Sequence, residues 1–410
     1  MEKIKDLLIK KGVKIPCPES VEIGDDINPD RISGDNVIIH SGCKLYGSET
    51  LIMPGARLGY EAPATIHDCQ IGKKVELSGG FFYGSTFLDD SSMGSGAHIR
   101  QACLLEEGAK GAHTVGLKQT ILFPFVTLGS LINFCDCLMA GGTGSKNHSE
   151  VGSSYIHFNF TQNQDKATAS LIGDIPRGVM INQKPIFLGG QGGIVGPVTI
   201  EYGTIVAAGT IVRKDIDKED TMLLGSPALA RSIPFHADIY SNIGRILKLN
   251  INYIASLIAL RSWYLNVRSI FAKDIFEKDL HKGAVEKLDA AISERLKQLR
   301  KIAEKMPESI DVQKSISDKP SEKLIMRKKE YGKKWPDIEA FLNGCIEEND
   351  DNRNRDGFLE IIVNAISQRG NHYITVVKSL EKEESQKGTE WLKRIIDSIN
   401  SRVWEFLPSF

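Results

Sequence analysis

The most regular pattern in the chain is a spacing of six residues between large aliphatic side chains. One row consists of Leu188, Ile194, Ile200, Val206 and Val212. A second row, also six apart, consists of Val198, Thr204, Thr210 and Ile216. This spacing fits neither an α-helix, with a period of about 3.6 residues, nor a simple strand, with a period of about two. It is typical of a parallel β-helix built from hexapeptide repeats, in which three hexads form one triangular coil of about eighteen residues.

Weaker hexads extend this pattern toward the N-terminus. Val37 and Cys43 are six apart, Ile71 and Leu77 repeat the spacing, and a later row contains Leu128, Phe134 and Ala140. The segment 81–96, FFYGSTFLDDSSMGSG, interrupts the pattern, and we expect it to leave the coil as a corner excursion. The pattern predicts a left-handed parallel β-helix over residues 36–234, preceded by an N-terminal segment over residues 1–35.

After Pro234 the hydrophobic period becomes helical. Leu288, Ile292, Leu296, Leu299 and Ile302 fall on one face of a helix. A longer, more apolar helix is expected over 239–271, and two more over 358–368 and 388–407, with loops at 315–323 and 347–357. All four tryptophans lie in this part of the chain. We therefore predict an α-helical domain over residues 235–410, whose apolar stripes pack as core or, alternatively, against a partner.

Composition and charge narrow the function classes. The chain has 410 residues, with 51 basic and 52 acidic side chains and a formal net charge of −1, so no electrostatic pull toward nucleic acid is expected. Its seven cysteines are odd in number and form no CxxC pair. Reduced, mostly buried thiols in a cytoplasmic protein are expected.

Two segments bear on targeting and membranes. The first sixteen residues are too charged for a signal peptide. The apolar window 251–265 is interrupted by Asn252, Ser256 and Arg261, and is expected to be too short and too polar to span a bilayer. Membrane contact is therefore not expected.

Two stretches carry a family resemblance. The first, 132–174, contains Gly-Ser-Lys, Asn-His and Asn-Phe landmarks in order, followed by a lysine, and the second reads GPVTIEYGTIVAAGTIVRKDI over 196–216. Together they resemble the acetyltransferase domain of the bacterial bifunctional N-acetylglucosamine-1-phosphate uridyltransferase / glucosamine-1-phosphate acetyltransferase. The uridyltransferase half has no counterpart, because no GxGTRM-like nucleotide loop opens the chain.

The resemblance implies roles for five acceptor-side residues. His148 matches the catalytic base, since an imidazole accepts a proton near neutral pH. Asp136 matches the carboxylate that orients this histidine. Asn159 and Lys166 match contacts to the acceptor sugar and its phosphate. Because the gap from His148 to Asn159 is shorter than in the family, His157 is an alternative base.

The resemblance also implies a donor site and an assembly. Gly190 and Gly196 match positions whose backbone faces the acetyl-thioester of acetyl-CoA, where N–H groups hold the developing oxyanion. Arg213 and Lys214 match the basic edge near the coenzyme A phosphates. The family forms homotrimers with sites between subunits, so a homotrimer is expected here, acting on an amino sugar phosphate or sugar nucleotide.

Two departures leave the acceptor open. Leu138 and Thr127 stand where the family has basic residues that grip the sugar phosphate, and a phosphate buried without cations is costly. The acceptor is therefore either a different sugar derivative or a non-phosphorylated amine or hydroxyl. A second hypothesis is a non-catalytic scaffold or sugar-nucleotide sensor whose helices recruit a separate nucleotidyltransferase.

Several of these residues also have a purely structural explanation. The run Gly189–Gly193, GGQGG, is also compatible with an ordinary tight corner, and Arg213 and Lys214 with a solvated edge. The histidines before residue 234 show no tight pair spacing suited to one metal, so no metal site is expected.

Overall fold

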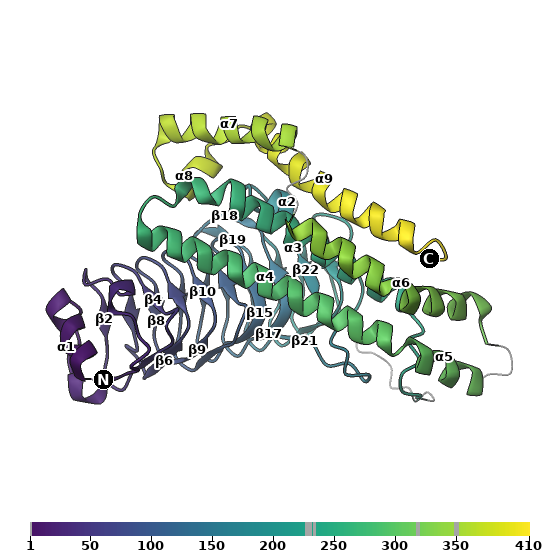
Figure 1. Ribbon diagram of the computed structural model, residues 1–410, viewed down its shortest axis with the longest axis horizontal. Helices are drawn as coiled ribbons and strands as arrows, with labels where there is room; N and C mark the ends of the chain where they lie inside the picture. The colour runs from purple at the N-terminus through teal and green to yellow at the C-terminus, as the bar shows by residue number, and fades with distance from the viewer. Residues whose placement is uncertain (1, 226–231, 233–234, 317–319, 348–351) are drawn as a thin grey trace.

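The structure is a computed structural model that describes residues 2–225, 232, 235–316, 320–347 and 352–410. It contains a parallel β-solenoid of about eleven turns followed by a helical region (Figure 1). This arrangement confirms the fold class that the hexads predict. The predicted division at Pro234 lies outside the described residues.

The solenoid has three faces, which the chain visits in the order face 1, face 2, face 3. Face 1 consists of β1 (Glu22–Ile23), β3 (Lys44–Tyr46), β6 (Ala64–His67), β9 (Gly80–Tyr83), β12 (Ala97–Ile99), β21 (Ile156–Phe158), β24 (Gly193–Val195) and β27 (Ile211–Val212). Face 2 consists of β4 (Leu51–Ile52), β7 (Gln70–Ile71), β10 (Thr86–Phe87), β13 (Leu104–Leu105), β22 (Ser170–Ile172) and β25 (Thr199–Ile200). The longer strands β15 (Gly116–Leu122) and β17 (Asn133–Met139) run from face 1 into face 2.

Face 3 consists of β2 (Ile38–Ile39), β5 (Arg57–Leu58), β8 (Glu76–Leu77), β11 (Ser92–Met93), β14 (Lys110–Gly111), β16 (Thr127–Leu128), β20 (Glu150–Val151), β23 (Phe187–Leu188), β26 (Ile205–Val206) and β28 (Met222–Leu223). A small antiparallel hairpin, β18 (Gly142–Gly144) and β19 (Asn147–His148), projects where face 2 meets face 3. We call the junction of faces 1 and 2 the first corner, that of faces 2 and 3 the second, and that of faces 3 and 1 the third.

The spacing of six follows directly from this geometry. Leu188 lies on face 3, Ile194 on face 1 and Ile200 on face 2, and all three side chains are buried inside the prism. One coil later, Val206 pairs with Leu188 and Val212 with Ile194. Each hexad therefore forms one face and supplies one inward aliphatic side chain to it. Parallel pairing of successive coils stacks these side chains into continuous interior columns.

Two parts of the N-terminal region differ from the expectation. The segment 81–96 is a regular coil rather than an excursion, because β9, β10 and β11 pair on both sides and Phe82, Phe87 and Met93 fill the interior. Large aromatic side chains therefore stand where the hexads suggest aliphatics. Residues 1–35 contain α1 (Glu2–Lys11), two 3-10 turns, η1 (Pro18–Ser20) and η2 (Pro29–Arg31), and β1, so parallel pairing already begins within this segment.

The helical region contains more helices than the periodicity indicates. The expected ones are α3 (Ile243–Asn266) with η3 (Arg268–Phe271), α4 (Ile275–Glu304), α7 (Asn352–Arg369) and α9 (Lys382–Phe406). The additional ones are α5 (Met306–Ser315), α6 (Glu322–Glu347) and α8 (Tyr373–Lys378), and a short α2 (Ile175–Gly178) lies at the second corner of the solenoid. Helix α7 begins inside the charged segment 347–357, which we expected to be a loop.

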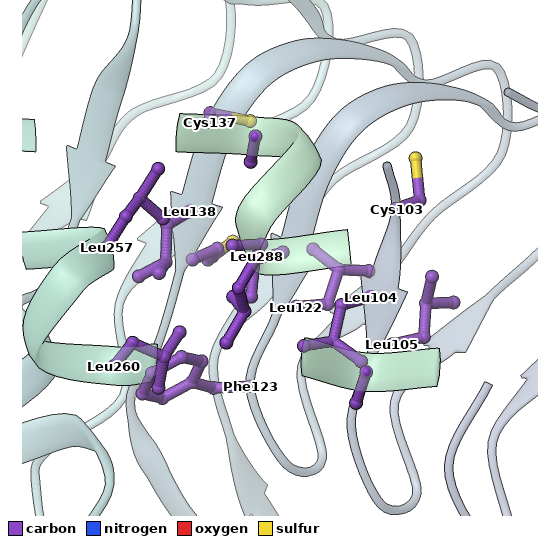
Figure 2. Close-up of a cluster of buried hydrophobic side chains, with 14 of the residues drawn as sticks. Cys103, Leu104, Leu105, Leu122, Phe123, Cys137, Leu138, Leu257, Leu260 and Leu288 are labelled. Atoms are coloured by element: carbon purple, nitrogen blue, oxygen red, sulfur yellow. The ribbon is translucent and has the colours of Figure 1, made fainter. Parts of the chain in front are cut away.

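Face 2 is covered by the chain's own helices. Helix α4 contacts β4, β7, β10 and β13, and α3 contacts β22, so both lie along the solenoid (Figure 1). Figure 2 shows Leu257 and Leu260 of α3 and Leu288 of α4 beside Leu104 and Leu138 of the solenoid. The apolar stripes are therefore core, and one continuous core joins the prism to the helices.

A second helical layer lies on the first. Helix α9 packs against α3, and α7 packs against α9. The indole rings of Trp263 and Trp391 lie 6.4 Å apart, with Phe358 of α7 beside both. The tryptophans thus belong to the helical core, as their segregation along the sequence indicates.

Helix α3 and η3 together form a long apolar segment. The segment Ile243–Phe271 spans 29 residues and is long and apolar enough, by length and composition, to cross a membrane, although we expected the window 251–265 within it to be too short and too polar. However, 72% of its most apolar window is buried inside the fold. Contact with the solenoid on one side and α9 on the other explains this composition.

Polar clamps fix the helical layer at both edges of face 2. At the first corner, Arg295 of α4 donates to Asp136 Oδ1 (2.8 Å) and Gln119 Oε1 (3.1 Å), and Arg295 and Asp136 are both 3% exposed. At the second corner, Arg268 of η3 pairs with Glu107 at 2.5 Å. Beside it, the Tyr264 hydroxyl donates to buried Glu106.

We expect Arg295→Met to lower the free energy of unfolding by about 3–5 kcal/mol, because it leaves the Asp136 carboxylate buried without its partner. Denaturant unfolding followed by circular dichroism measures this change. Adding Asp136→Leu should restore part of the loss, since both charges are then gone. The control Arg300→Met removes an exposed pair with Glu339 and should change stability little. Wild-type stability of Arg295→Met would contradict a structural clamp.

Candidate functional site

The predicted site residues lie on all three corners of the solenoid. Asp136, the segment 159–166, Gly196 and the pair Arg213 and Lys214 lie at or next to the first corner, between faces 1 and 2. His148 lies in the hairpin at the second corner, and Gly190 lies at the third. Within one chain, the structure therefore does not gather these residues into one pocket.

His148 lies in a polar, half-buried setting. Its Nδ1 is 3.0 Å from the Ser145 carbonyl oxygen, which can only accept a hydrogen bond, so Nδ1 carries a proton and donates it. In the neutral ring, Nε2 then holds the free lone pair, and it lies 4.0 Å from a carboxylate oxygen of Glu150. This tautomer is the one a general base at Nε2 requires.

The hairpin that carries His148 is held by short local contacts. Asn147 Nδ2 donates to Thr143 Oγ1 at 2.9 Å, and the Ser149 hydroxyl donates to the Ala140 carbonyl at 2.8 Å. Gly142, at φ +102, lets the two strands approach closely. A Cβ at Gly144 would lie 3.5 Å from Nζ of Lys378, so α8 of the helical layer lies beside the hairpin.

Within one chain, Asp136 is engaged elsewhere and does not contact His148. Its side chain at the first corner is hydrogen bonded to Arg295, and it is buried under α4. Burial raises the pKa of Asp136, and the Arg295 guanidinium opposes that rise. The residue that fixes the His148 tautomer is instead Ser145, through its backbone, which no sequence motif identifies.

His157 is also removed from any acceptor. It is 2% exposed and points into the prism, where its Nε2 lies 2.8 Å from the Ser170 hydroxyl oxygen. Burial lowers its pKa to about 4, so the ring is neutral at physiological pH. A side chain in this position contacts neither an acceptor nor solvent, and we do not include it in the proposed site.

The segment that carries Asn159 and Lys166 lies beside the helical layer. Lys305 Nζ donates to the Asn163 carbonyl at 2.8 Å, and Arg295 donates to the Lys166 carbonyl at 3.1 Å. The Lys166 side chain is exposed, Asn159 is half-buried, and Phe160 is largely exposed. The helices thus fix the backbone of this segment while its side chains stay open to solvent.

The glycines of the predicted donor site are required by neighbouring coils. A Cβ at Gly196 would lie 2.1 Å from the Thr168 carbonyl oxygen, and one at Gly190 would lie 2.7 Å from that of Ser153. Gly189, Gly192 and Gly193 meet equally close contacts, each under 3.0 Å. Coil packing alone accounts for this glycine run, so its abundance gives no separate indication of a ligand.

Arg213 and Lys214 follow β27 and are both exposed. Among the residues that the structure describes, neither forms an ion pair, whereas the next residue, Asp215, is paired with Arg245 of α3. The two side chains are therefore available to an anionic ligand at the end of face 1.

The last coils of faces 1 and 3 expose large apolar side chains in register. On face 3, Phe187, Ile205 and Met222 stand on successive rungs, each at least 40% exposed. On face 1, Ile156 and Ile211 flank Gly193. These two apolar columns lie on either side of the third corner, where Gly190 turns the chain.

No group of three or more His, Cys, Asp or Glu side chains suited to a metal ion occurs among the described residues. Five of the seven cysteines are buried. Metal-dependent chemistry has no ligand set in this part of the chain.

Comparison with known proteins agrees with the resemblance seen in the sequence. No protein-family model matches the chain. Relatives named "Bifunctional protein GlmU" match its N-terminal half, including those of Thermotoga petrophila (26% identical over 223 residues, 53% of this chain and 43% of the relative) and Trichlorobacter lovleyi (25% over 226 residues, 55% and 44%). The chain spans less than half the length of these relatives. They support an acetyltransferase-like β-helix and leave the helical region unmatched.

We expect Gly196→Ala to destabilise the fold by about 1–3 kcal/mol, because the added methyl group meets a backbone carbonyl inside the solenoid. Thermal unfolding measures this change. Gly209→Ala is the matched control, because its Cβ would meet nothing within 4 Å and only its φ of +72 opposes the change. If Gly196→Ala melts like the wild type and loses only coenzyme binding, the packing explanation is wrong.

Proposed function

We propose that the chain is an acyl-CoA-dependent N-acetyltransferase that acts on an amino sugar phosphate or sugar nucleotide in the cytoplasm. The observation that carries this proposal is the setting of His148. Its Nδ1 is hydrogen bonded to a backbone carbonyl, and its Nε2 lies at a half-exposed corner. The relatives supply independent support for acetyl transfer as the class of reaction.

The reaction needs only one proton relay. The acceptor amine attacks the thioester carbonyl of acetyl-CoA, and Nε2 of His148 takes the proton that the nitrogen loses. The C–S bond then breaks, and the coenzyme A thiolate leaves and is protonated. Glu150, 4.0 Å from Nε2, stabilises the imidazolium in place of Asp136.

A complete site requires residues from more than one subunit. His148 lies on the second corner, whereas Asn159, Lys166, Arg213 and Lys214 lie on or near the first. A homotrimer with parallel prisms brings corners of neighbouring subunits together. The apolar columns beside the third corner support such packing, since exposed apolar rows of this kind mark protein contacts.

We expect His148→Ala to lower turnover by about 10²–10⁴-fold, because the amine then loses its general base. The measurement is release of coenzyme A thiol in the presence of amino sugar acceptors. His113→Ala, at the third corner, is the matched control and should retain activity. Unchanged turnover in His148→Ala would contradict the assignment.

A second candidate function is favoured by the covered face. Leu138, at the position of a phosphate-gripping cation in the resembling family, is buried beside Leu257 of α3 (Figure 2). Asp136 is held by Arg295. Both changes fit a non-catalytic scaffold or sugar-nucleotide sensor that works with a separate nucleotidyltransferase.

Titration calorimetry with acetyl-CoA separates the two candidates. The acetyltransferase predicts micromolar binding that weakens about tenfold or more in the Arg213→Ala, Lys214→Ala double variant, because two phosphate contacts are lost. The control variant Lys387→Ala removes an exposed lysine of α9 and should bind normally. No heat from a folded trimer, together with binding of a sugar nucleotide, would favour the scaffold.

A further inference from the structure

A pocket of about 280 Å³ lies between the second corner and the helical layer. The solenoid contributes Lys73, Asp89, Asp90, Glu107 and Phe125 from successive coils. The helical side contributes the end of α3, η3, the first turns of α4 and the start of α8. None of its lining residues belongs to the hairpin of His148, so it is separate from the proposed catalytic corner and does not depend on the proposed function.

The charges in this pocket are only partly compensated. Lys73 pairs with Glu277 at 2.5 Å, and Arg268 pairs with Glu107 Oε1 at 2.5 Å. Asp89 accepts a hydrogen bond from the Lys73 backbone N–H at 2.8 Å, but no lysine or arginine side chain pairs with it among the described residues. With Asp90 also present, the carboxylates of the lining outnumber its lysine and arginine side chains, so the pocket favours a cation.

One buried donor in the same wall has no partner. The Arg268 side chain is 8% exposed and stacked on the Tyr373 ring, 3.9 Å from its centroid. Its Nη1 forms no hydrogen bond among the described residues, and Glu107 Oε2 is likewise buried without a partner. Buried polar groups of this kind are normally satisfied, so a ligand or water with an oxygen acceptor and an N–H or O–H donor fits here.

The chemistry of the wall restricts the ligand. A metal ion has no set of three ligands among the described residues. The remaining surface is apolar and aromatic, with Phe125, Phe271 and Tyr373. Such a surface suits the carbon skeleton of an organic molecule, and the faces of the aromatic rings attract a cation. The volume is below the usual range for drug-sized ligands and matches a smaller molecule.

We propose that this pocket binds a small hydroxylated primary amine of the amino sugar or amino alcohol class. The ammonium group lies against Asp89 and Glu107, and a ligand oxygen accepts from Arg268 Nη1. Because the pocket joins the solenoid to η3, α4 and α8, the bound amine also stabilises the contact between the two parts of the chain.

Calorimetric titration of the full chain with glucosamine, and with glucose as the neutral analogue, tests this proposal. We expect glucosamine to bind at least tenfold more tightly than glucose. Asp89→Asn should weaken glucosamine binding by about 10–100-fold, because the charged partner is lost while the amide oxygen still accepts from the Lys73 N–H. Asp397→Asn, on the exposed face of α9, is the control and should bind like the wild type.

A comparison of two pH values adds an independent readout. Burial raises the pKa of Asp89 to about 6, with Glu107 and Asp90 adding to the effect. Asp89 is therefore mostly ionised at pH 7 and mostly protonated at pH 5, and glucosamine binding should weaken about tenfold at pH 5. Other charged or titratable groups face the pocket and are intact in both the wild type and Asp89→Asn: Lys73, Asp90, Glu107, Arg268, Glu277, His281 and His372. The pH effect should accordingly be smaller in Asp89→Asn than in the wild type, because the substitution removes only the contribution of Asp89.

Three results would overturn the proposal. They are no heat from glucosamine with the folded protein, equal binding of glucose, or unchanged binding by an Asp89→Asn variant that melts like the wild type. His148→Ala should leave this binding intact. If glucosamine binding is lost in His148→Ala but retained in Asp89→Asn, the amine occupies the catalytic corner, and the pocket holds only water.

Discussion

Burial of face 2 beneath α3 and α4 is the constraint on which the rest of the structure depends. An outer prism face that carries Leu104, Ile121 and Leu138 on successive rungs is too apolar to remain in water, and the stripes of α3 and α4 need an apolar surface to stay helical. The buried pair of Arg295 and Asp136 and the pair of Arg268 and Glu107 then fix the layer at the two corners. Apolar contact supplies the driving force, and the charged pairs fix one position along the face.

This covering decides where chemistry is possible. Positions on face 2 that a free prism would present to a ligand, such as Leu138, are core here, and Asp136 has become part of a clamp. Faces 1 and 3 remain open in the described chain, and their last coils expose the apolar columns beside the third corner. The helical layer therefore leaves assembly surfaces free while it closes one side of each subunit.

Sequence patterns predict local geometry well because the residues that define each hexad are close together in the sequence. The rows through Leu188 and Val198 identify the inward positions, and the stripe through Leu288 identifies the buried face of α4. They do not identify the clamp, because Arg295 and Asp136 are 159 residues apart and nothing near either residue indicates the other. A motif likewise gives the type of residue at position 157 but not its direction, and strand register places that histidine inside the prism. Glycines at 190 and 196 fit a ligand or a neighbouring coil equally well until the coil is seen.

The separation of the proposed roles on different corners ties catalysis to assembly. If His148 of one subunit serves an amine held beside Lys166 and Lys214 of another, no isolated chain holds a complete site. Association then contributes to activity directly, because it creates the site rather than adjusting it. A base fixed by the Ser145 carbonyl suits this arrangement, since a backbone contact within the hairpin keeps the imidazole in its working tautomer before any partner arrives. Each subunit thus holds its base in the working tautomer but lacks the residues that another subunit contributes to the site. Because face 2 is covered, the partner subunit can pack only on faces 1 and 3.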